Sequence, residues 1–346
     1  MQNQVNGRQN RILFFALDGF ELFVFHFLFP HELGFVVRCC DFYGSSTTNF
    51  SVFETLLQML LSFTPNPCFE RTLRLENFRS SATFRVDSPE ILVTAGGKGI
   101  NSARVAQNLG LPAHVLTFVG NQQIGQFRAL LENDDLRGDL IATESPTRTT
   151  MAVVSSENLT EIIENGVAPT LSEGAQLLEK WRELLPHCAL AVIGGSYAPS
   201  SERGWHLHGA LLCQLAAGAG KRVIYDGKGE AFVRALHCPT PPWAIKPNLE
   251  EAAATWGKPI ETPAQERGAI RYFLARGVEV VLLSCGARGL YVGYNRQIEW
   301  FAAPAVETIS PVGSGDSLVG AFCAKFAQCG DVFEAARWGV AAGSAN

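Results

Sequence analysis

The chain has 346 residues, of which 47% are hydrophobic and 18% are charged, and its formal net charge is -5 at pH 7. This composition is typical of a globular protein with one large domain or two modest ones, and it excludes an intrinsically disordered chain. The negative charge argues against nucleic acid as a partner, because a phosphate backbone requires a basic surface.

The first 58 residues differ from the rest, because they contain 11 of the 23 phenylalanines. Asp18, Glu21 and His26 interrupt their apolar runs, whereas a membrane span needs about 20 apolar residues with few charges. No small-residue cleavage site follows at the distance expected of a secretory signal. We therefore predict no membrane partner, and we interpret residues 1–58 as an atypical, poorly ordered N-terminal extension without a function.

From residue 59 onward, short apolar runs alternate with helical stretches. Strands are predicted at 60–63, 115–119, 190–193, 222–225, 243–245 and 278–283, and helices at 101–109, 125–131, 171–185, 202–218, 249–255, 262–275 and 316–328. Apolar strands that alternate with amphipathic helices predict an α/β fold with helices on both faces of a mostly parallel sheet.

Two stretches break this alternation, residues 71–93 and 146–165. They carry alternating polar and apolar residues, as in Met151–Val154 before Glu157. Such a pattern suits strands with one face toward solvent. We therefore predict a small β lid over the site at the strand ends.

The nine cysteines are scattered singly apart from Cys39 and Cys40, and none has C-x-x-C or zinc-ligand spacing. Their number is odd, and a chain of this length does not need disulfide staples. We therefore expect reduced, mostly buried thiols in a cytoplasmic protein.

A glycine-rich turn at residues 310–317 (SPVGSGDS) leads into an apolar helix. Gly313 and Gly315 allow a tight turn that directs several N–H groups, including that of Ser314, toward one point, and the helix adds the positive end of its dipole. This pattern predicts an anion site. Asp316 could cap the helix, or it could take a proton from an acceptor hydroxyl while the N–H groups stabilise a transferring phosphoryl group.

Spacing excludes two other phosphate-binding loops. A Walker A loop requires G-x-x-x-x-G-K-[ST], and Gly97-Lys98 is followed by Gly99. A dinucleotide-binding loop requires G-x-G-x-x-G, and Gly313–Gly315 is followed by Leu318 in place of the third glycine. An NAD-dependent oxidoreductase shares this sheet type but lacks support here.

Five segments, in order, resemble the phosphofructokinase-B branch of the ribokinase superfamily. They are residues 96–104 (GGKGINSAR), 147–149 (TRT), 246–251 (KPNLEE), 284–289 (SCGARG) and 313–316 (GSGD). A sixth, residues 339–346 (GVAAGSAN), is similar to the family's helix beside the adenine. The resemblance covers about residues 60–346 and implies a three-layer ribokinase-like fold with a small β lid, in a kinase domain of residues 59–346.

The resemblance also implies an activity. The chain looks like kinases that transfer the γ-phosphoryl group of ATP to a hydroxyl of fructose 1-phosphate, fructose 6-phosphate or tagatose 6-phosphate. Asp316 would be the base, and the anion hole would comprise Gly313, Ser314 and Gly315. The residues implied to bind the sugar substrate are Glu70, Gly97, Lys98, Asn101 and Arg148. Without the resemblance, a surface lysine and a solvated strand arginine would explain Lys98 and Arg148 equally well.

On the nucleotide side, the resemblance implies a second group of residues. The residues expected to bind ATP are Lys246, Asn248, Ser284, Gly286, Gly289, Gly343 and Asn346. Asn248 and Glu251 are three residues apart and would hold Mg²⁺ through water, since Mg²⁺ usually keeps several of its waters. Spacing alone leaves Glu251 equally explained as a solvated carboxylate on a helix.

Two features depart from the family pattern. The family begins N-P-x-x-D, and its Asp binds sugar hydroxyls, whereas this chain has Glu70 at that position, one methylene longer. The chain also ends at Asn346, where relatives continue through another helix or two. These departures keep two alternatives open: a kinase for a non-phosphorylated sugar or a nucleoside, and a weak or inactive homologue that only binds sugar phosphate or nucleotide. A homodimer is compatible with either.

Overall fold

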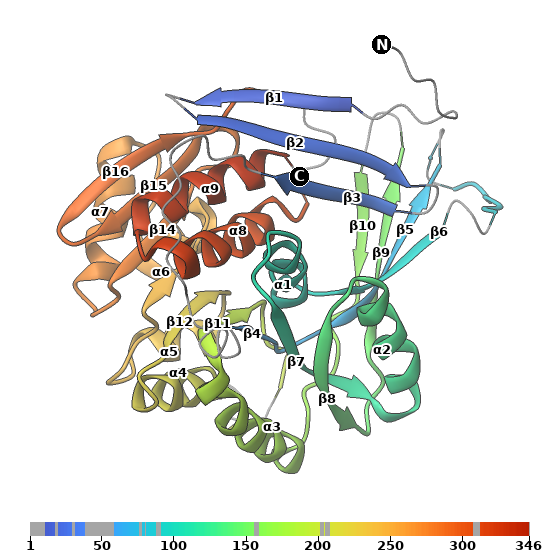
Figure 1. Cartoon of the computed structure of the whole chain (residues 1–346). Coiled ribbons are helices and arrows are strands. Elements are labelled where there is room, and N and C mark those ends of the chain that lie inside the picture. The colour runs from blue at the N-terminus through green and yellow to red at the C-terminus, as the bar shows by residue number, and fades with distance from the viewer. Residues whose placement is uncertain are drawn as a thin grey trace, which may run out of the picture.

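The computed structural model describes most of the chain from residue 59 onward (Figure 1). The described residues are 59–75, 78–79, 81–87, 91–155, 159–200, 204, 208–306 and 312–345, together with the backbone of 11–17, 20–29 and 32–38. Those last three segments are β1 (Arg11–Leu17), β2 (Phe20–Phe29) and β3 (Glu32–Arg38), which form an antiparallel sheet in the order β1-β2-β3. The other residues of 1–58 lie outside the described part, so the poorly ordered extension stays a prediction.

A nine-stranded sheet forms the centre of the fold, in the order β16-β15-β14-β13-β12-β11-β4-β7-β8. Its strands are β4 (Met59–Thr64), β7 (Ala113–Gly120), β8 (Arg137–Thr143), β11 (Cys188–Gly194), β12 (Arg222–Asp226), β13 (Ala244–Ile245), β14 (Val280–Ser284), β15 (Gly289–Tyr294) and β16 (Gln297–Ala302). The strands from β14 to β8 pair in parallel, and β15 and β16 add an antiparallel hairpin at one edge. The predicted mostly parallel sheet is confirmed.

Helices cover both faces of this sheet (Figure 1). They are α1 (Lys98–Asn108), α2 (Ile124–Asn133), α3 (Leu171–Leu184), α4 (His208–Gly218), α5 (Glu230–Leu236), α6 (Leu249–Trp256), α7 (Pro263–Leu274), α8 (Ser314–Cys329) and α9 (Val332–Ala345). Successive strand side chains point to opposite faces, so Leu60 packs with α1, α2, α8 and α9, while Leu61 packs with α3 to α7. The three-layer α/β fold predicted from the sequence is therefore confirmed.

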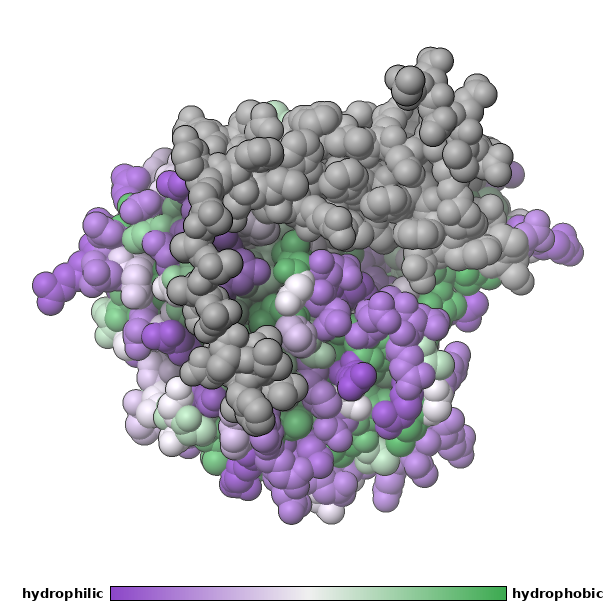
Figure 2. Space-filling view, viewed as in Figure 1, coloured by the Kyte–Doolittle hydropathy of each residue, from purple (hydrophilic) through white to green (hydrophobic). Residues whose placement is uncertain are grey.

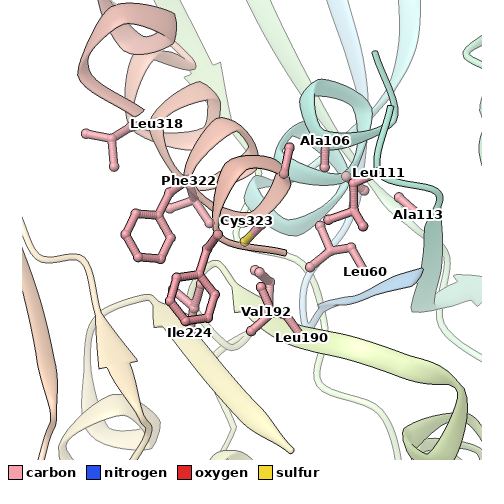
Figure 3. Packing of buried hydrophobic residues seen from close by; sticks show 14 of the residues in the cluster. Leu60, Ala106, Leu111, Ala113, Leu190, Val192, Ile224, Leu318, Phe322 and Cys323 are labelled. Atoms are coloured by element: carbon pink, nitrogen blue, oxygen red, sulfur yellow. The ribbon is translucent and has the colours of Figure 1, made fainter. Parts of the chain in front are cut away.

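Helix α8 is buried from Asp316 to Ala324, whereas its first residues, Ser314 and Gly315, are only half-buried. Phe322 and Cys323 are both fully buried, and Figure 3 shows them in one cluster with Val192 and Ile224 of the sheet. A helix that is apolar all round is typical of a core position. Truncating a buried phenylalanine such as Phe322 to alanine costs about 3–5 kcal/mol of stability.

The two segments that break the alternation form a separate four-stranded sheet, in the order β10-β9-β5-β6. Its strands are β5 (Cys68–Arg74), β6 (Ile91–Gly96), β9 (Arg148–Val154) and β10 (Leu159–Ile163). Phe69 of β5 packs edge-on against Phe127 of α2, with ring centroids 5.3 Å apart. This contact attaches the small sheet to the main domain beside α2.

Several elements were not predicted: β8, α5 and the β15–β16 hairpin. The hairpin turns at Asn295 and Arg296, which both have positive φ (48° and 66°). Two positive φ angles are the geometry of a type I′ turn, which is usually marked by Asn-Gly. Because arginine stands where glycine is usual, the sequence carries only a weak signal for this turn. The helix predicted from residue 202 begins at His208 in the described part.

Hydrophilic residues dominate the described surface in the lower half of Figure 2, and hydrophobic residues show mainly in the recesses between them. None of the helices in the described part of the chain combines the length and the apolar character that a membrane crossing requires. Among the described cysteines, Cys68, Cys188, Cys213, Cys285 and Cys323 are buried free thiols, and Cys329 is exposed.

Candidate active site

The N-terminus of α1 lies against the carboxyl ends of β4 and β11. The hydroxyl of Ser62 donates to the carbonyl of Gly99 at 2.7 Å, and the N–H of Ile100 donates to Oγ1 of Thr64 at 3.0 Å. A Cβ atom on Gly194 would lie 2.4 Å from the nitrogen of Gly99. Glycine is therefore required at this crossing, because any side chain would push α1 away from the sheet.

Helix α8 begins at the same place, with Gly313 as its N-cap at φ +84°. This left-handed backbone conformation favours glycine over any other residue. The N–H of Ser317 donates to the carbonyl of Gly313 at 2.8 Å, which closes the first turn. The first N–H groups of an α-helix have no acceptor within the helix, and they lie at the positive end of its dipole. The predicted anion loop therefore has the expected backbone geometry.

The carboxylate of Asp316 is held by two side chains of α1. Its Oδ1 accepts a hydrogen bond from Lys98 Nζ at 2.9 Å, and its Oδ2 accepts one from Asn101 Nδ2 at 2.9 Å. The carbonyl of Asp316 also accepts from the hydroxyl of Ser102, at 3.1 Å. These bonds run to α1, whereas a capping role would direct the carboxylate to N–H groups of α8 itself.

Two lysines share a second buried carboxylate, Asp226, at the end of β12. Lys98 Nζ lies 3.1 Å from Oδ2 of Asp226, and Lys246 Nζ lies 3.4 Å from its Oδ1. Asp226 is 1% exposed and Lys246 is 3% exposed. A Cβ atom on Gly315 would lie 3.0 Å from Lys246 Nζ and 3.9 Å from Lys98 Nζ. Both ammonium groups therefore lie beside the anion loop.

The charge of Lys98 is stabilised by its neighbours. Its partial burial on its own would lower the pKa of Lys98, but the carboxylates of Asp226 and Asp316 outweigh this effect and raise the pKa above its usual value. Lys98 thus stays protonated throughout the physiological range.

Glu70 lies on β5 above the glycine turn that precedes α1. A Cβ atom on Gly96 would lie 2.8 Å from Oε2 of Glu70, so the carboxyl group rests on this glycine. Burial raises the pKa of Glu70, Arg104 lowers it, and the negative charge of Asp316 raises it further. The two carboxyl groups are therefore close enough to interact through their charges.

Arg148 begins β9 and binds backbone carbonyl groups. Its Nε and one terminal nitrogen donate to the carbonyl of Asn66 at 3.3 and 3.0 Å, and the other terminal nitrogen donates to the carbonyl of Glu164 at 2.8 Å. A pocket lies beside this guanidinium, and Asp316 is not among the residues that line it. Its lining includes Asn66, Thr147, Arg148, Gly166 and Val167.

Asn248 and Glu251 form a capping box at the start of α6. Asn248 Oδ1 accepts from the N–H of Glu251 at 2.8 Å, and Glu251 Oε2 accepts from the N–H of Asn248 at 3.0 Å. This reciprocal pair satisfies two N–H groups of the helix start and fixes both side chains. Carboxylate and amide oxygens are also the ligands that Mg²⁺ prefers, so the donor set fits the ion that the resemblance implies.

The loop after β14 carries the predicted nucleotide residues Ser284, Gly286 and Gly289. The N–H of Ser284 donates to the carbonyl of Pro247 at 3.0 Å, which ties this loop to the segment before α6. Gly286 and Gly289 have φ angles of +59° and +131°. These angles make a sharp turn that leads into β15.

Gly343 of α9 packs against the first turn of α8. A Cβ atom on Gly343 would lie 2.9 Å from the carbonyl oxygen of Ser314. Its visible role is therefore the close approach of α9 to the anion loop. The predicted nucleotide residue Asn346 lies outside the described residues.

Residues 73–346 match the pfkB family of carbohydrate kinases. The chain belongs to this family. The predicted resemblance is confirmed, and the pfkB chain is a phosphotransferase with an alcohol group as acceptor. Sugar kinases of this family use ATP.

Solved structures of phosphofructokinases resemble this pfkB kinase. The tetrameric inhibited form of phosphofructokinase-2 from Escherichia coli is 26% identical, with a TM-score of 0.75, over 84% of this chain and 93% of that chain. The same enzyme in complex with fructose 6-phosphate gives 25% identity and a TM-score of 0.74, over 84% and 93%. A Thermotoga maritima protein named as a possible 1-phosphofructokinase has a TM-score of 0.76 over 83% and 91%. Its 21% identity supports the fold alone.

The structure of the pfkB kinase brings some predicted residues together and adds others. Lys98, Asn101, Asp316 and Lys246 form one group around the anion loop. Asp226 was not predicted as a site residue, although an acid at the end of an apolar strand was an available signal, because the ends of parallel strands carry ligand-binding groups. Arg104, which donates a hydrogen bond to Asn101, had no predicted role either.

Proposed function

We propose that this pfkB kinase transfers the γ-phosphoryl group of ATP to a hydroxyl of a ketohexose phosphate, with Asp316 as the catalytic base. The arrangement of Asp316 carries this proposal. Its carboxylate lies in the first turn of α8 and is oriented by Lys98 and Asn101 of α1. A proton acceptor beside a phosphate-binding helix end is the combination that phosphoryl transfer to a hydroxyl requires.

In this mechanism, the acceptor hydroxyl oxygen attacks the γ-phosphorus while Asp316 takes the hydroxyl proton. The bond from the γ-phosphorus to the oxygen that bridges it to the β-phosphorus breaks, and ADP leaves. The N–H groups at the start of α8 and the ammonium groups of Lys98 and Lys246 counter the negative charge on the transferring group. These groups are held in place before the reaction, so they need not reorganise during it.

Mg²⁺, when bound, would neutralise charge on the nucleotide phosphates. Asn248 and Glu251 are the residues that would hold it, through water. In the part of the chain that the structure describes, no cluster of three or more His, Cys, Asp or Glu residues is arranged to hold a metal ion. The proposed Mg²⁺ site therefore consists of the amide of Asn248, the carboxylate of Glu251 and water.

A phosphorylated acceptor is supported by the cation at Arg148. The guanidinium borders a pocket with Thr147 and Gly166, where it could bind a phosphate. The similarity to phosphofructokinase-2 solved with fructose 6-phosphate supports the same class of acceptor. Glu70 would accept hydrogen bonds from sugar hydroxyls, and its extra methylene would make that side of the site tighter than an aspartate does.

A non-phosphorylated sugar or nucleoside is the second candidate for the acceptor. It is favoured by the contacts of the two cations among the predicted sugar-binding residues, Lys98 and Arg148. Lys98 is paired with Asp226 and Asp316, and Arg148 donates to two backbone carbonyl groups. If these contacts persist when substrate is bound, less positive charge is free for an acceptor phosphate.

An ADP-release assay with a panel of acceptors tests the proposal. The panel comprises fructose 6-phosphate, fructose 1-phosphate, tagatose 6-phosphate, fructose, ribose and a nucleoside, each with ATP and Mg²⁺. We expect turnover with a ketohexose phosphate, and a loss of about 10²–10⁴-fold in Asp316→Asn with the fold retained. Higher turnover with free sugars would favour the second candidate. Binding of sugar phosphate or nucleotide without any turnover would point to an inactive homologue.

The proposal includes self-association. Ile162 and Ile163 of β10 are both 58% exposed, so the small sheet carries apolar side chains that a second copy could cover. Light scattering would give the mass in solution. A mass equal to one chain would contradict the homodimer without affecting the assigned reaction.

A further inference from the structure

Asn101 stands between the catalytic base and an arginine. Its Nδ2 donates to Oδ2 of Asp316 at 2.9 Å, and its Oδ1 accepts from a terminal nitrogen of Arg104 at 2.8 Å. Arg104 follows Asn101 by three residues on α1, and residues at this spacing are neighbours on one helix face. The amide of Asn101 is therefore bonded at both ends.

Arginine determines which way this amide points. A guanidinium can only donate hydrogen bonds, whereas an asparagine amide has an oxygen that accepts and an NH₂ group that donates. Arg104 therefore requires the oxygen of Asn101 to face it. The NH₂ group must then face Asp316, which is the orientation that a carboxylate needs. With the opposite orientation, the amide oxygen would repel the carboxylate.

Arg104 is itself fixed by three further hydrogen bonds. Its Nε and a terminal nitrogen donate to Oδ2 of Asp134 at 2.8 and 2.7 Å, and the same terminal nitrogen donates to the carbonyl of Ala95 at 2.8 Å. The side chains of Arg104 and Asp134 are 25% and 19% exposed. Charge-assisted bonds of this kind are the stronger class of hydrogen bond. Partial burial also reduces their screening by salt.

These contacts join three separate parts of the fold. Asp134 is the C-cap residue that follows α2, and Ala95 lies in β6 of the small sheet, one residue before the Gly96-Gly97 turn. Both lie outside α1 and α8, so their position does not depend on the anion loop. Asp134 and Ala95 therefore hold the guanidinium in place while it orients Asn101.

We propose that Arg104 is a positioning residue for phosphoryl transfer, which acts by holding the amide of Asn101 in the one orientation that supports Asp316. The inference rests on the proposed function only in taking Asp316 as the base. Arg104 is expected to affect the chemical step through Asn101 and not to contact the transferring group.

A double-mutant cycle measures this dependence. Arg104→Met removes the donors and keeps an unbranched side chain, and we expect kcat to fall about 10- to 100-fold, the size of effect that small misplacements of catalytic groups produce. The KM for ATP should change little. In an Asn101→Ala background, the same Arg104→Met change should lower kcat by less than about twofold, because the group on which it acts is gone.

Two controls separate positioning from a general structural effect. Arg104→Lys keeps a donor and a positive charge, and it should recover part of the lost kcat. Arg234→Met removes an exposed arginine that pairs with Glu230 on α5, far from these contacts in sequence, and it should leave kcat unchanged. Equal losses of kcat with Arg104→Met in the wild-type and Asn101→Ala backgrounds would overturn the proposal. Such a result would mean that Arg104 affects kcat through another group, for example through its interaction with the charge of Glu70.

An NMR measurement tests the inference without turnover. The side-chain amide signals of Asn101 are assigned by their loss in Asn101→Ala. In the wild type, we expect two well-separated NH₂ signals, because Nδ2 of Asn101 donates to the Asp316 carboxylate, and we expect these signals to move in Asp316→Asn. In Arg104→Met, the separation of the two signals should shrink because the amide is free to turn. An unchanged separation in Arg104→Met would overturn the inference, even if no acceptor supports turnover and the proposed function fails.

Discussion

The ammonium group of Lys98 lies 2.9 Å from Oδ1 of Asp316 and 3.1 Å from Oδ2 of Asp226. The family resemblance places this lysine among the residues that bind the sugar substrate. In the structure, it bridges two acids that are far apart in the chain and are both buried. A cation between two buried carboxylates offsets their mutual repulsion, which would otherwise disfavour both charges at once.

Lys98→Met should therefore impair the chemical step. We expect kcat to fall about 10²–10³-fold, as when a donor that stabilises developing charge is removed. If Lys98 acts mainly through the two carboxylates, the loss should be similar for fructose 6-phosphate and for fructose. The measurement is kcat and KM for both acceptors, with Lys98→Arg as the variant that keeps the charge. A rise in KM confined to the phosphorylated acceptor would instead support the phosphate-binding role.

Glu70→Gln should stabilise the protein at neutral pH. Burial raises the pKa of Glu70 above its ordinary value of 4.5, so the folded chain binds this proton more tightly than the unfolded chain does. Between the ordinary and the raised pKa, the folded state holds more protons, and the free energy of unfolding falls as pH rises. Glutamine carries no charge, so in Glu70→Gln residue 70 no longer makes the free energy of unfolding fall as pH rises.

Thermal unfolding of both proteins at two pH values checks this sign. The melting temperature of Glu70→Gln should exceed that of the wild type at about pH 8, and the two should converge at about pH 4, where the wild-type carboxyl is protonated in both states. Glu70→Asp keeps the charge and has the side-chain length that is usual in the family. A difference in melting temperature that is the same at both pH values would show that burial of the charge is not the cause.

Glu251→Gln should weaken the Mg²⁺ dependence of turnover without unfolding α6. The capping box of α7 already uses glutamine, because Gln265 Oε1 accepts from the N–H of Thr262 at 2.9 Å. Glutamine at 251 can therefore keep the helix start while it removes the charge. We expect the Mg²⁺ concentration for half-maximal rate to rise about tenfold or more, as for residues around a metal site. Glu250→Gln, an exposed neighbour on the same turn, is the control and should behave as the wild type.

Gly343→Ala and Gly339→Ala should separate packing from catalysis. A Cβ atom would lie 2.9 Å from the carbonyl of Ser314 in the first case and 2.9 Å from the carbonyl of Leu318 in the second. Both variants overpack the α8–α9 contact, and each should cost about 1–3 kcal/mol in denaturant unfolding. Only Gly343→Ala presses on the anion loop, so it alone should lower kcat. Equal kcat values for the two variants would contradict this difference.

The sequence by itself determined the α/β class and the glycine turn that precedes α8. Continuous apolar runs such as 190–193 are typical of strands covered on both faces, and the helices between them supply the cover. Gly313 could be recognised locally as well, because a tight turn before an apolar helix requires glycine wherever it occurs. These properties depend on neighbours within a few residues.

Only the tertiary structure decided which charges meet. Asp226, Lys98 and Asp316 come from the end of β12 and the starts of α1 and α8, and no local pattern links Lys98 to acids that are 128 and 218 residues away. Arg104 likewise meets its partner Asp134 only in the folded chain, because Asp134 caps a different helix, α2, 30 residues away. Contacts of this kind arise because parallel strands end at one edge of the sheet, and the packing of helices over that edge then selects the partners.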